Sequence, residues 1–350
     1  MFKSESSGFA TPEITSCEPR ESNGSVRELP MPKIGFVGVG HMGSAMAANL
    51  SAAGYSVTAY VRRPDFFDNL VALGIRPTTD FTQLFDCEIV ISMLPDDAAA
   101  CQTVFGRAEL GTSGLAAGLM AGAIHLSMST ISTTASSELA REHASHRQGY
   151  VAAPVFGNPT AAAARELFIV AAGAPADVKR CQPLLERLGQ RTFVLGTDPA
   201  YANLVKLLGN MMTATALEML GETVALLLKR GFDPKPFVDI MTGTMFGGRV
   251  HKIYGDKILT QSYAAGFGLP LALKDVRLAL AEAERASAPM PSVGVVRDRL
   301  ITGVARGYTD LDWTALGLVA AEEAGLHLIA PTAQLEVANT YGRTANDRSR

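Results

Sequence analysis

The segment spanning residues 33–50, KIGFVGVGHMGSAMAANL, constrains the fold of this chain more than any other. It opens with the apolar, β-branched run IGFVGV, which is typical of a strand covered on both faces. Three glycines follow in the pattern G-x-G-x-x-G, at Gly38, Gly40 and Gly43. Apolar residues then recur at helical spacing. The segment therefore predicts a buried strand that turns tightly into a helix.

The glycine turn has the pattern of a dinucleotide-binding turn. In such turns the first glycine permits the bend, the second lets a pyrophosphate approach the main chain, and the third lets helix and strand pack closely. The helix N-terminus adds free N–H groups and a partial positive charge. A plain βα turn with glycines for packing is the alternative, which the strand–turn–helix context disfavours. The residues predicted to contact the cofactor here are Gly38, Val39, Gly40, His41, Met42 and Gly43.

Strand and helix patterns alternate through the first part of the chain. Strand patterns follow at YSVTAYV, CEIVISML, AIHLSMST, YVAAPVF, LFIVAAG and TFVLG. Helical patterns lie between them, for instance TTASSELAREHASHR and PADVKRCQPLLERLG. Strands that alternate with helices predict an α/β fold with a doubly wound, mostly parallel sheet of Rossmann type. We expect this dinucleotide-binding domain to cover residues 32–197.

The pattern changes after residue 197. From Pro199 to a C-capping Gly231 the sequence reads as one long interdomain helix. Its apolar positions go nearly all round, which predicts burial along much of its length. Only helical patterns follow, so we expect an all-α domain over residues 198–326. The polar residues 1–31 predict a disordered extension, and 327–350 a loose tail.

Composition argues against several classes of protein. Lys and Arg number 31 against 34 Asp and Glu, a net charge of −3 with no basic block, so neither nucleic acid nor an anionic membrane is an expected partner. No apolar stretch looks long and uninterrupted enough to span a bilayer, and the N-terminal residues lack the apolar core of a secretory signal. These features predict a cytoplasmic protein.

The cysteines and histidines give no sign of a metal site. The four cysteines are scattered without a C-x-x-C pair, as expected of reduced cytosolic thiols that mostly fill the core. The six histidines form no H-x-x-x-H pair, so no structural metal is predicted. His143 and His146 could share one helix face, for which we expect a solvated surface.

Two arginines at the end of the second strand indicate the cofactor. NAD-binding turns place a carboxylate about 20 residues after the glycines to bind the ribose 2′-OH. This chain has Arg62 and Arg63 there, and guanidinium groups match a 2′-phosphate. We therefore predict NADP(H), with NAD(H) as the alternative if Asp65 meets the ribose instead. Leu94 and Pro95, which close the CEIVISML strand, are also predicted to contact the cofactor.

Hydroxyl and glycine residues follow two later strands. Ser129 and Thr130 end a predicted parallel strand, where open α/β sheets bind ligands. They would bind a substrate carboxylate or the nicotinamide amide; helix capping is the alternative, better suited to Ser132 and its neighbours. Gly157 and Asn158 lie in a turn whose N–H groups could bind an anion, and an ordinary Asn-Pro turn is equally consistent.

The long helix carries one lysine in a strongly apolar run. Lys206 has Asn203 three residues before it and Asn210 four after, so the three share one helix face. A lysine in apolar surroundings titrates closer to neutral pH, which suits a general acid. A lysine that extends to solvent is the alternative. Farther on, Lys274 and Asp275 start a helix, where Lys274 could reach a nucleotide or substrate anion, or form a surface ion pair.

Together these motifs resemble the β-hydroxyacid dehydrogenases, the relatives of 3-hydroxyisobutyrate dehydrogenase. Order and spacing fit from about residue 33 to 325. The matches are G-x-G-x-M-G at Gly38, Gly40, Met42 and Gly43, S-T at Ser129 and Thr130, A-P-V at Ala153, Pro154 and Val155, K-L-x-x-N at Lys206, Leu207 and Asn210, and K-D at Lys274 and Asp275.

The resemblance implies a role for each group of residues. Lys206 would be the catalytic proton donor and acceptor, with Asn210 assisting. Ser129, Thr130 and the turn at Gly157 and Asn158 would hold the substrate carboxylate, and Lys274 would contact both cofactor and substrate. The helical domain would pack against a second subunit, in a homodimer or homotetramer.

The implied activity is hydride transfer between NADP(H) and a small 3- or 4-hydroxy acid or the matching semialdehyde acid. Two departures from the family pattern leave the substrate open. Phe156 stands where a serine is usual, and Met128 replaces the acidic lead into Ser129. Imine reductases share the fold but usually lack the lysine, so imine reduction is the first alternative. A non-enzymatic nucleotide-binding module is the second.

Overall fold

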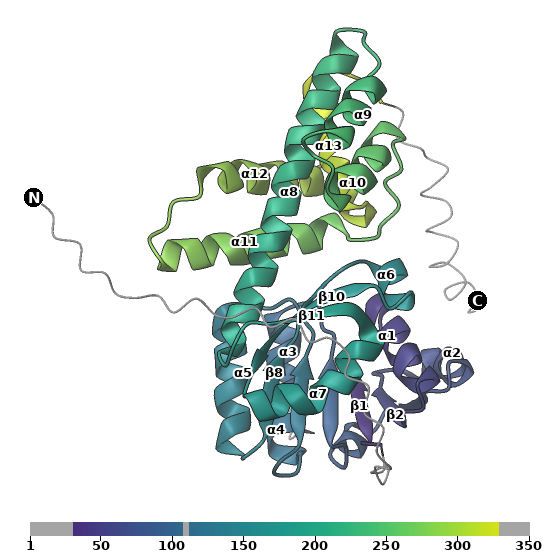
Figure 1. Ribbon diagram of the computed structural model, residues 1–350, viewed down its shortest axis with the longest axis vertical. Helices are drawn as coiled ribbons and strands as arrows, with labels where there is room; N and C mark the ends of the chain where they lie inside the picture. The colour runs from purple at the N-terminus through teal and green to yellow at the C-terminus, as the bar shows by residue number, and fades with distance from the viewer. Residues whose placement is uncertain (1–30, 108–111, 329–350) are drawn as a thin grey trace, which may run out of the picture. The chain divides into compact units, whose positions relative to one another are not determined.

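The computed structural model describes residues 31–107 and 112–328 (Figure 1). The extension expected over residues 1–31 lies almost wholly outside this part, as does most of the expected tail. The chain divides into two compact units between Lys206 and Leu207. This division falls inside the long helix α8 (Pro199–Lys229).

A nine-stranded sheet forms the centre of the first unit. The strand order is β11-β10-β8-β7-β4-β1-β2-β3, and β9 pairs with β10. All pairs are parallel except those of β10 with β8 and β9. This is the mostly parallel, doubly wound sheet that the sequence predicted. Its strands are β1 (Ile34–Val37), β2 (Val57–Tyr60), β3 (Arg76–Thr78), β4 (Ile89–Ser92), β7 (Ile124–Ser127), β8 (Gly149–Ala152), β9 (Val155–Phe156), β10 (Leu167–Gly173) and β11 (Gly189–Val194).

Helices pack on both faces of this sheet (Figure 1). Alternate residues of a strand point to opposite faces. Accordingly Val151 packs into one cluster with α1 and α7, whereas its neighbour Tyr150 packs into another with α3 and α5. The helices are α1 (His41–Ala52), α2 (Phe67–Ala72), α3 (Asp97–Phe105), α4 (Leu115–Gly118), α5 (Thr133–Ser145), α6 (Pro159–Ala163) and α7 (Pro175–Leu188). A small hairpin of β5 (Gly106–Arg107) and β6 (Thr112–Ser113) follows α3.

The predicted strand YVAAPVF is two strands. Pro154 separates β8 from β9, and β9 pairs only with β10 in the register Phe168 to Phe156. Proline has no N–H to donate to the ladder, so the pairing is interrupted there. The Pro154 carbonyl still accepts a hydrogen bond from the Val170 N–H at 3.0 Å.

The second unit is helical. Besides the end of α8 it contains α9 (Lys235–Gly243), α10 (Arg249–Leu259), α11 (Leu269–Arg285), α12 (Pro291–Ala305) and α13 (Leu316–Glu323). Between residues 207 and 328 no strand occurs, and only two isolated β-bridges link residues outside the helices. Helix α8 passes very close to α13, because a Cβ on Gly221 would lie 2.8 Å from the Cα of Gly317. The prediction of an all-helical second part is confirmed.

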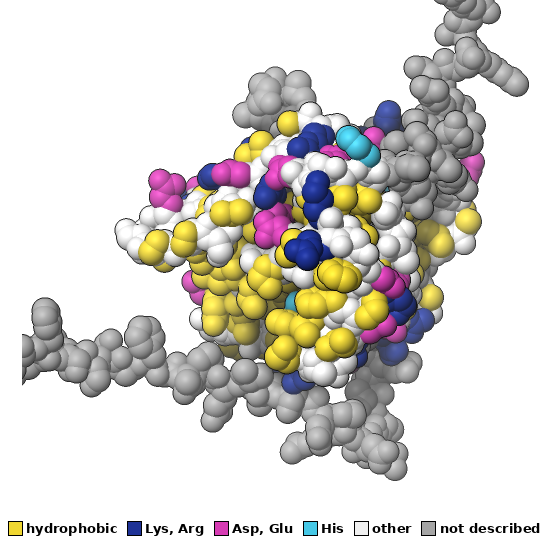
Figure 2. All heavy atoms as spheres, turned by 90° about the horizontal axis from the view of Figure 1, so that it is seen from above, with side chains coloured by type: hydrophobic (Ala, Val, Ile, Leu, Met, Phe, Trp, Pro, Cys, Tyr) yellow, Lys and Arg dark blue, Asp and Glu magenta, His cyan; other side chains and the backbone are white. Residues whose placement is uncertain are grey.

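The prediction that α8 is buried along much of its length is wrong. Met212, Met219 and Leu226 are 66%, 53% and 63% exposed. They follow one another at intervals of seven residues, so they form one apolar stripe along the helix. The view in Figure 2 shows hydrophobic side chains gathered beside charged ones on part of the surface.

Helix α8 also corrects the expectation about membrane spans. Its length and hydropathy are those of a span, and 33% of the apolar window is buried within the protein. Core helices of soluble proteins pass the same test. Since buried polar residues such as Asn203, Asn210 and Glu218 occur along it, α8 is a packed helix of this fold.

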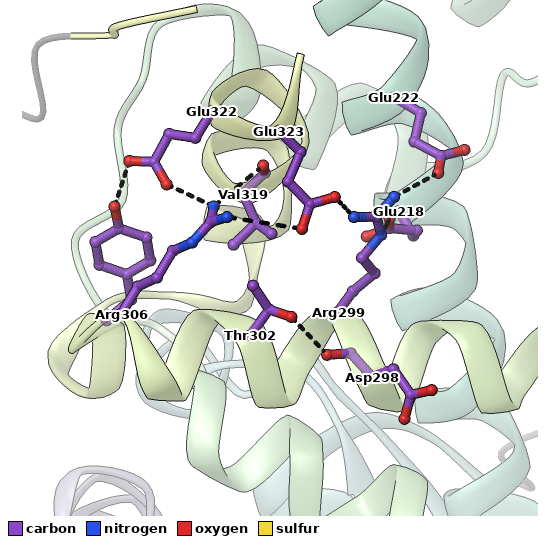
Figure 3. Close-up of polar contacts among 10 residues, drawn as sticks. Glu218, Glu222, Asp298, Arg299, Thr302, Arg306, Val319, Glu322 and Glu323 are labelled. Carbon is purple, nitrogen blue, oxygen red and sulfur yellow. Dashed lines mark hydrogen bonds and ion pairs between the residues drawn. The ribbon is translucent and has the colours of Figure 1, made fainter. Parts of the chain in front are cut away.

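Ion pairs tie three helices of the second unit together (Figure 3). Arg299 of α12 contacts Glu218 of α8 at 2.9 Å and also pairs with Glu323 of α13. Arg306 pairs with Glu322 at 2.7 Å, and Glu322 accepts a hydrogen bond from the Tyr308 hydroxyl. Burial raises the pKa of Glu218 to about 7, against the lowering effect of Arg299. Burial therefore opposes the charge of Glu218 more strongly than its ion pair favours it.

Candidate active site

The glycine turn after β1 requires glycine at two positions. Gly38 has a φ of +93°, and a Cβ there would lie 2.2 Å from the carbonyl oxygen of Met93. A Cβ on Gly43 would lie 2.0 Å from the carbonyl oxygen of Gly38. A side chain at Gly38 would force the turn away from the segment after β4, and one at Gly43 would force the helix away from the strand.

Gly40 is different, because a Cβ there would meet no atom within 4 Å. It is exposed and caps α1 without any side-chain hydrogen bond. Two hydrogen bonds from Ser44 hold the turn in place. Its hydroxyl donates to the Val39 carbonyl at 2.7 Å, and its N–H donates to the Gly40 carbonyl at 2.8 Å. The open main chain beside a helix N-terminus fits the pyrophosphate of a dinucleotide. His41 is exposed and Met42 partly buried at the same turn.

Parallel register brings the other predicted residues to the same edge of the sheet. Val37 at the end of β1 is level with Tyr60 of β2 and Ser92 of β4, and Ser92 is level with Ser127 of β7. The chain beyond these strand ends carries Arg62 and Arg63, Leu94 and Pro95, and Ser129 and Thr130.

Both arginines after β2 are exposed. The Nε of Arg63 lies 3.8 Å from Asp65 Oδ2, with both side chains largely in solvent. This is a solvent-exposed ion pair of the kind that contributes little to stability.

Ser129 binds the main chain of the fold with its hydroxyl. Its Oγ accepts a hydrogen bond from the Leu94 N–H at 2.8 Å and donates to the Ser92 carbonyl at 3.3 Å, and the residue is fully buried. Ser129 therefore holds the segment after β4 in place, and its neighbour Thr130 is the more exposed of the pair. Ser132 caps α5 by accepting from the Ala135 N–H at 3.0 Å, as the capping alternative anticipated.

A buried histidine pair lies beneath this edge, and sequence reasoning missed it. His125 Nδ1 is 2.9 Å from His143 Nε2, His143 Nδ1 is 2.7 Å from Gln148 Oε1, and Ser92 Oγ is 2.8 Å from His125 Nε2. Gln148 donates both its amide hydrogens to main-chain carbonyls, so its Oε1 must accept from His143. With both rings neutral, His143 then accepts from His125, and His125 accepts from the Ser92 hydroxyl.

The expectation of a solvated surface for His143 is therefore wrong. The His143 side chain is fully buried and stacks on the ring of Tyr150, whereas the His146 side chain stays partly in solvent. Burial lowers the pKa of His125 well below its usual value, and that of His143 as well. Only the spacing of His143 and Gln148 around the end of α5 could have suggested a partner, and spacing alone does not indicate burial.

The turn after β9 is tightly built. Gly157 has a φ of +146°, and a Cβ there would lie 2.5 Å from Leu167 Cδ2. Asn158 caps α6, because its Oδ1 accepts from the Ala161 N–H at 2.9 Å. The side chain of Asn158 thus has the ordinary Asn-Pro turn role, and any anion contact would come from the main chain.

Lys206 is nearly buried, at 7% exposed. Its Nζ lies 4.4 Å from the centre of the Phe156 ring. One turn earlier, Asn203 Nδ2 donates to the Ser129 carbonyl at 3.3 Å and so ties α8 to the segment that follows β7. The alternative in which Lys206 extends into solvent does not apply.

The second unit carries the remaining predicted residues. Asn210 follows Lys206 on α8 by one helical turn, and its Nδ2 donates to Asp275 Oδ2 at 2.6 Å. Lys274 Nζ lies 3.0 Å from Asp275 Oδ1, and Asp275 is only 1% exposed. This is a buried carboxylate bridging two polar side chains, and the surface ion pair considered from the sequence is excluded.

In the part of the chain that the structure describes, no group of three or more His, Cys, Asp or Glu side chains could hold a metal ion. Of the cysteines within it, Cys87 and Cys181 are buried and Cys101 is partly buried. Cys17 lies outside the described residues.

Two family profiles match consecutive parts of the chain. Residues 33–196 match the NAD binding domain of 6-phosphogluconate dehydrogenase. Residues 200–327 match the NAD-binding domain of NADP-dependent 3-hydroxyisobutyrate dehydrogenase.

Relatives and solved structures agree with these profiles. The chain is 39% identical to an uncharacterised oxidoreductase of Bacillus subtilis over 81% of its own length and 98% of that protein. It is 31% identical to 3-hydroxyisobutyrate dehydrogenase of Pseudomonas aeruginosa, over 77% and 91% of the two chains. Among solved structures, 3-hydroxyisobutyrate dehydrogenase of Salmonella typhimurium superposes with a TM-score of 0.73 at 21% identity, covering 82% of this chain and 99% of that one. An imine reductase of a Pseudomonas species superposes with a TM-score of 0.54 at 22% identity, covering 83% and 99%. At these identities the structural likeness shows the fold alone.

The glycine turn yields the first prediction. We expect Gly40→Ala to fold as stably as the wild type but to bind the dinucleotide at least about tenfold more weakly, because its methyl group occupies the open side of the turn. Gly43→Ala serves as the matched comparison. It should lose about 1–3 kcal/mol of unfolding free energy through overpacking. Urea denaturation and cofactor fluorescence titration measure both effects. Full cofactor affinity in Gly40→Ala would contradict the assignment of the pyrophosphate to this turn.

Proposed function

The chain belongs to the β-hydroxyacid dehydrogenase family, and we propose that it is an NADP(H)-dependent reductase of a small semialdehyde or keto acid. In the reverse direction it would oxidise the matching 3- or 4-hydroxy acid. The coarser activity, NAD(P)-dependent oxidoreduction, follows from the family. The cofactor preference, the substrate and the residue roles below are our proposal.

Lys206 carries the proposal. It is a nearly buried ammonium group at the start of α8, and Asn203 holds that part of the helix to the main chain of Ser129. The bound nicotinamide supplies or accepts a hydride at the substrate carbon. Lys206 Nζ donates the proton that the substrate oxygen needs during reduction and accepts it during oxidation. Asn210 assists from the next turn of the helix.

The substrate carboxylate would be bound by main-chain N–H groups, a hydroxyl and a cation. The main-chain N–H groups of the turn at Gly157 and Asn158 form a small anion site. Thr130 and Lys274 add a hydroxyl and a positive charge. The hydroxyl of Ser129 already bonds to the main chain, so this residue would act by holding the segment after β4 in place.

NADP(H) is favoured over NAD(H) by the charges after β2. Arg62 and Arg63 are both exposed there, and each guanidinium group matches a phosphate in charge and geometry. The profile matching residues 200–327 describes an NADP-dependent enzyme. Leu94 and Pro95 follow β4, on the other side of β1, and lie at the same edge of the sheet.

Imine reduction remains the alternative activity, since an imine reductase shares the fold. An imine can react as its protonated iminium ion, which needs only a hydride, whereas a carbonyl oxygen must also take up a proton to become an alcohol. The nearly buried Lys206 therefore favours a carbonyl substrate. A non-enzymatic nucleotide-binding module would leave the buried lysine without a purpose.

We further propose a cytoplasmic homodimer or homotetramer. The apolar stripe of Met212, Met219 and Leu226 on α8 is exposed in the single chain, and a second copy of the same helix would cover it. No nucleic acid or membrane partner is proposed.

The second prediction concerns the reaction itself. NADPH consumption should be observed with at least one of glyoxylate, succinic semialdehyde, methylmalonate semialdehyde and tartronate semialdehyde. Lys206→Ala should then lower kcat by about 10²–10⁴-fold, since the proton donor is lost. Lys179→Ala, which removes an exposed lysine of α7, is the matched control and should keep full activity. Near-complete kcat in Lys206→Ala would refute the assigned role, and turnover of cyclic imines alone would favour the alternative.

The third prediction concerns the cofactor. Arg62→Asp should reduce kcat/KM for NADPH by at least about tenfold relative to NADH, because a carboxylate repels the 2′-phosphate and binds the 2′-OH. Arg187→Asp, at an exposed position of α7, makes the same charge change as a control. Equal kcat/KM for the two cofactors in the wild type would disprove the preference.

The fourth prediction concerns assembly. Met219→Lys should shift the protein toward the monomer in sedimentation velocity, because a charge would be buried in the middle of the stripe. Val71→Lys places the same side chain on an exposed apolar position of α2 and should leave the mass unchanged. A wild-type protein that sediments as a monomer at micromolar concentration would end this proposal.

A further inference from the structure

The contact between Lys206 and Phe156 has no counterpart in the motifs that relate this chain to its family. The lysine ammonium lies over the ring at 4.4 Å from its centre. Lys206 is 7% exposed, so water competes little for the ammonium group. A cation over an aromatic face within about 6 Å is attracted by the negative potential of that face.

The ring is held in place from two sides. Its backbone lies in β9, where the register with β10 sets Phe156 opposite Phe168. The residue packs against a buried apolar cluster that includes Ala152, Val170 and Ala202. The next residue, Gly157, has no room for a side chain against Leu167. The face that Phe156 presents to Lys206 is therefore built into the fold.

We infer that Phe156 is a positioning residue that binds the ammonium form of Lys206 and so keeps this lysine ready as the proton donor for carbonyl reduction. The inference rests on the proposed function, in which Lys206 exchanges the proton. It adds the pH range in which Lys206 can act as donor and names the side chain that extends this range.

The electrostatics differ between the two forms of the lysine. The ring face attracts the ammonium group, but has little interaction with a neutral amine. Burial acts in the opposite direction, because it disfavours the charged form. Phe156 therefore offsets part of the desolvation cost of Lys206. The serine usual at this position in the family would offer a hydroxyl in place of the ring.

The consequence for the reaction follows from the proton balance. In reduction the carbonyl carbon gains a hydride, the C=O double bond becomes single, and the oxygen takes a proton from Lys206 Nζ. The lysine is left as a neutral amine, which water must reprotonate before the next turnover. The ring favours that reprotonation, since it restores the contact with the cation.

The experiment changes the ring's electrostatics and keeps its shape. Pentafluorophenylalanine incorporated at position 156 removes the negative potential of the ring face. Competitive acetylation with acetic anhydride across pH, read by peptide mass spectrometry, then gives the titration midpoint of Lys206 without any substrate. We expect the midpoint to fall by about 0.5–1 pH unit relative to wild type.

A matched control exists in the same unit. Arg191 lies over the ring of Phe193 at 4.5 Å, so the same fluorinated residue at position 193 disrupts a comparable contact with a different cation. That variant should leave the midpoint of Lys206 unchanged. Phe156→Tyr keeps an aromatic face and should also retain the wild-type midpoint. A midpoint that stays the same or rises on fluorination at position 156 overturns the inference.

A kinetic measurement separates this inference from the proposed function. The alkaline decline of kcat for reduction should move to lower pH on fluorination at position 156, with KM for the substrate little changed. If Lys206→Ala keeps its activity, the proposed function fails. If Lys206→Ala loses activity while fluorination leaves the titration midpoint and the pH profile in place, only the role of Phe156 fails.

Discussion

The parallel register of β2, β1, β4 and β7 is the constraint on which the candidate site depends. Because these strands end level with one another, the glycine turn, the two arginines, the Leu94 segment and Ser129 all emerge at one edge of the sheet. The close contact between Gly43 and the Gly38 carbonyl fixes the helix that follows the first strand. The hydrogen bond from the Leu94 N–H to Ser129 Oγ then joins two of the strand ends directly. The strand register therefore places these residues at one edge of the sheet, although they are distant in sequence. Contacts between their side chains are not required.

Local patterns predicted most elements of this fold, but not the short strands β3, β5 and β6. Strand–glycine–helix spacing predicts β1 and α1, and the change to purely helical patterns predicts the second unit. Pro154 limited this reasoning, because the alternation on either side of it resembles one strand while its missing N–H breaks the ladder. The burial of α8 was misjudged for a related reason. Apolar residues all round a helix indicate that each face has a partner, but the sequence does not distinguish a partner in the same chain from one in another.

Long-range contacts among side chains could not be predicted in the same way. The burial of Lys206 depends on Phe156, which is fifty residues earlier, and on the strand to which Asn203 bonds. The direct contact of His125 with His143 joins β7 to the end of α5, and His143 bonds in turn to a glutamine whose orientation is set by two carbonyls. Such networks leave no periodic trace, since each member occupies an ordinary core position in its own element. Ser129 illustrates the converse, because a motif position that suggests ligand binding has its hydroxyl bonded within the fold.

The hydroxyl of Ser129 and the ring of Phe156 together suggest how substrate choice arises on this scaffold. Both lie next to polar main chain at the carboxyl end of a strand, where a side-chain hydroxyl could bind a carboxylate. The Ser129 hydroxyl bonds instead to the Ser92 carbonyl of β4, and the Phe156 ring contacts Lys206. In the proposed function, the main-chain N–H groups of the Gly157 turn remain as the anion site. Because such groups would bind any carboxylate of suitable size, discrimination would have to come from the shape of the space around them. The Phe156 ring packs against a buried apolar cluster and lies beside Lys206, so it would limit that space on the side of the proposed proton donor.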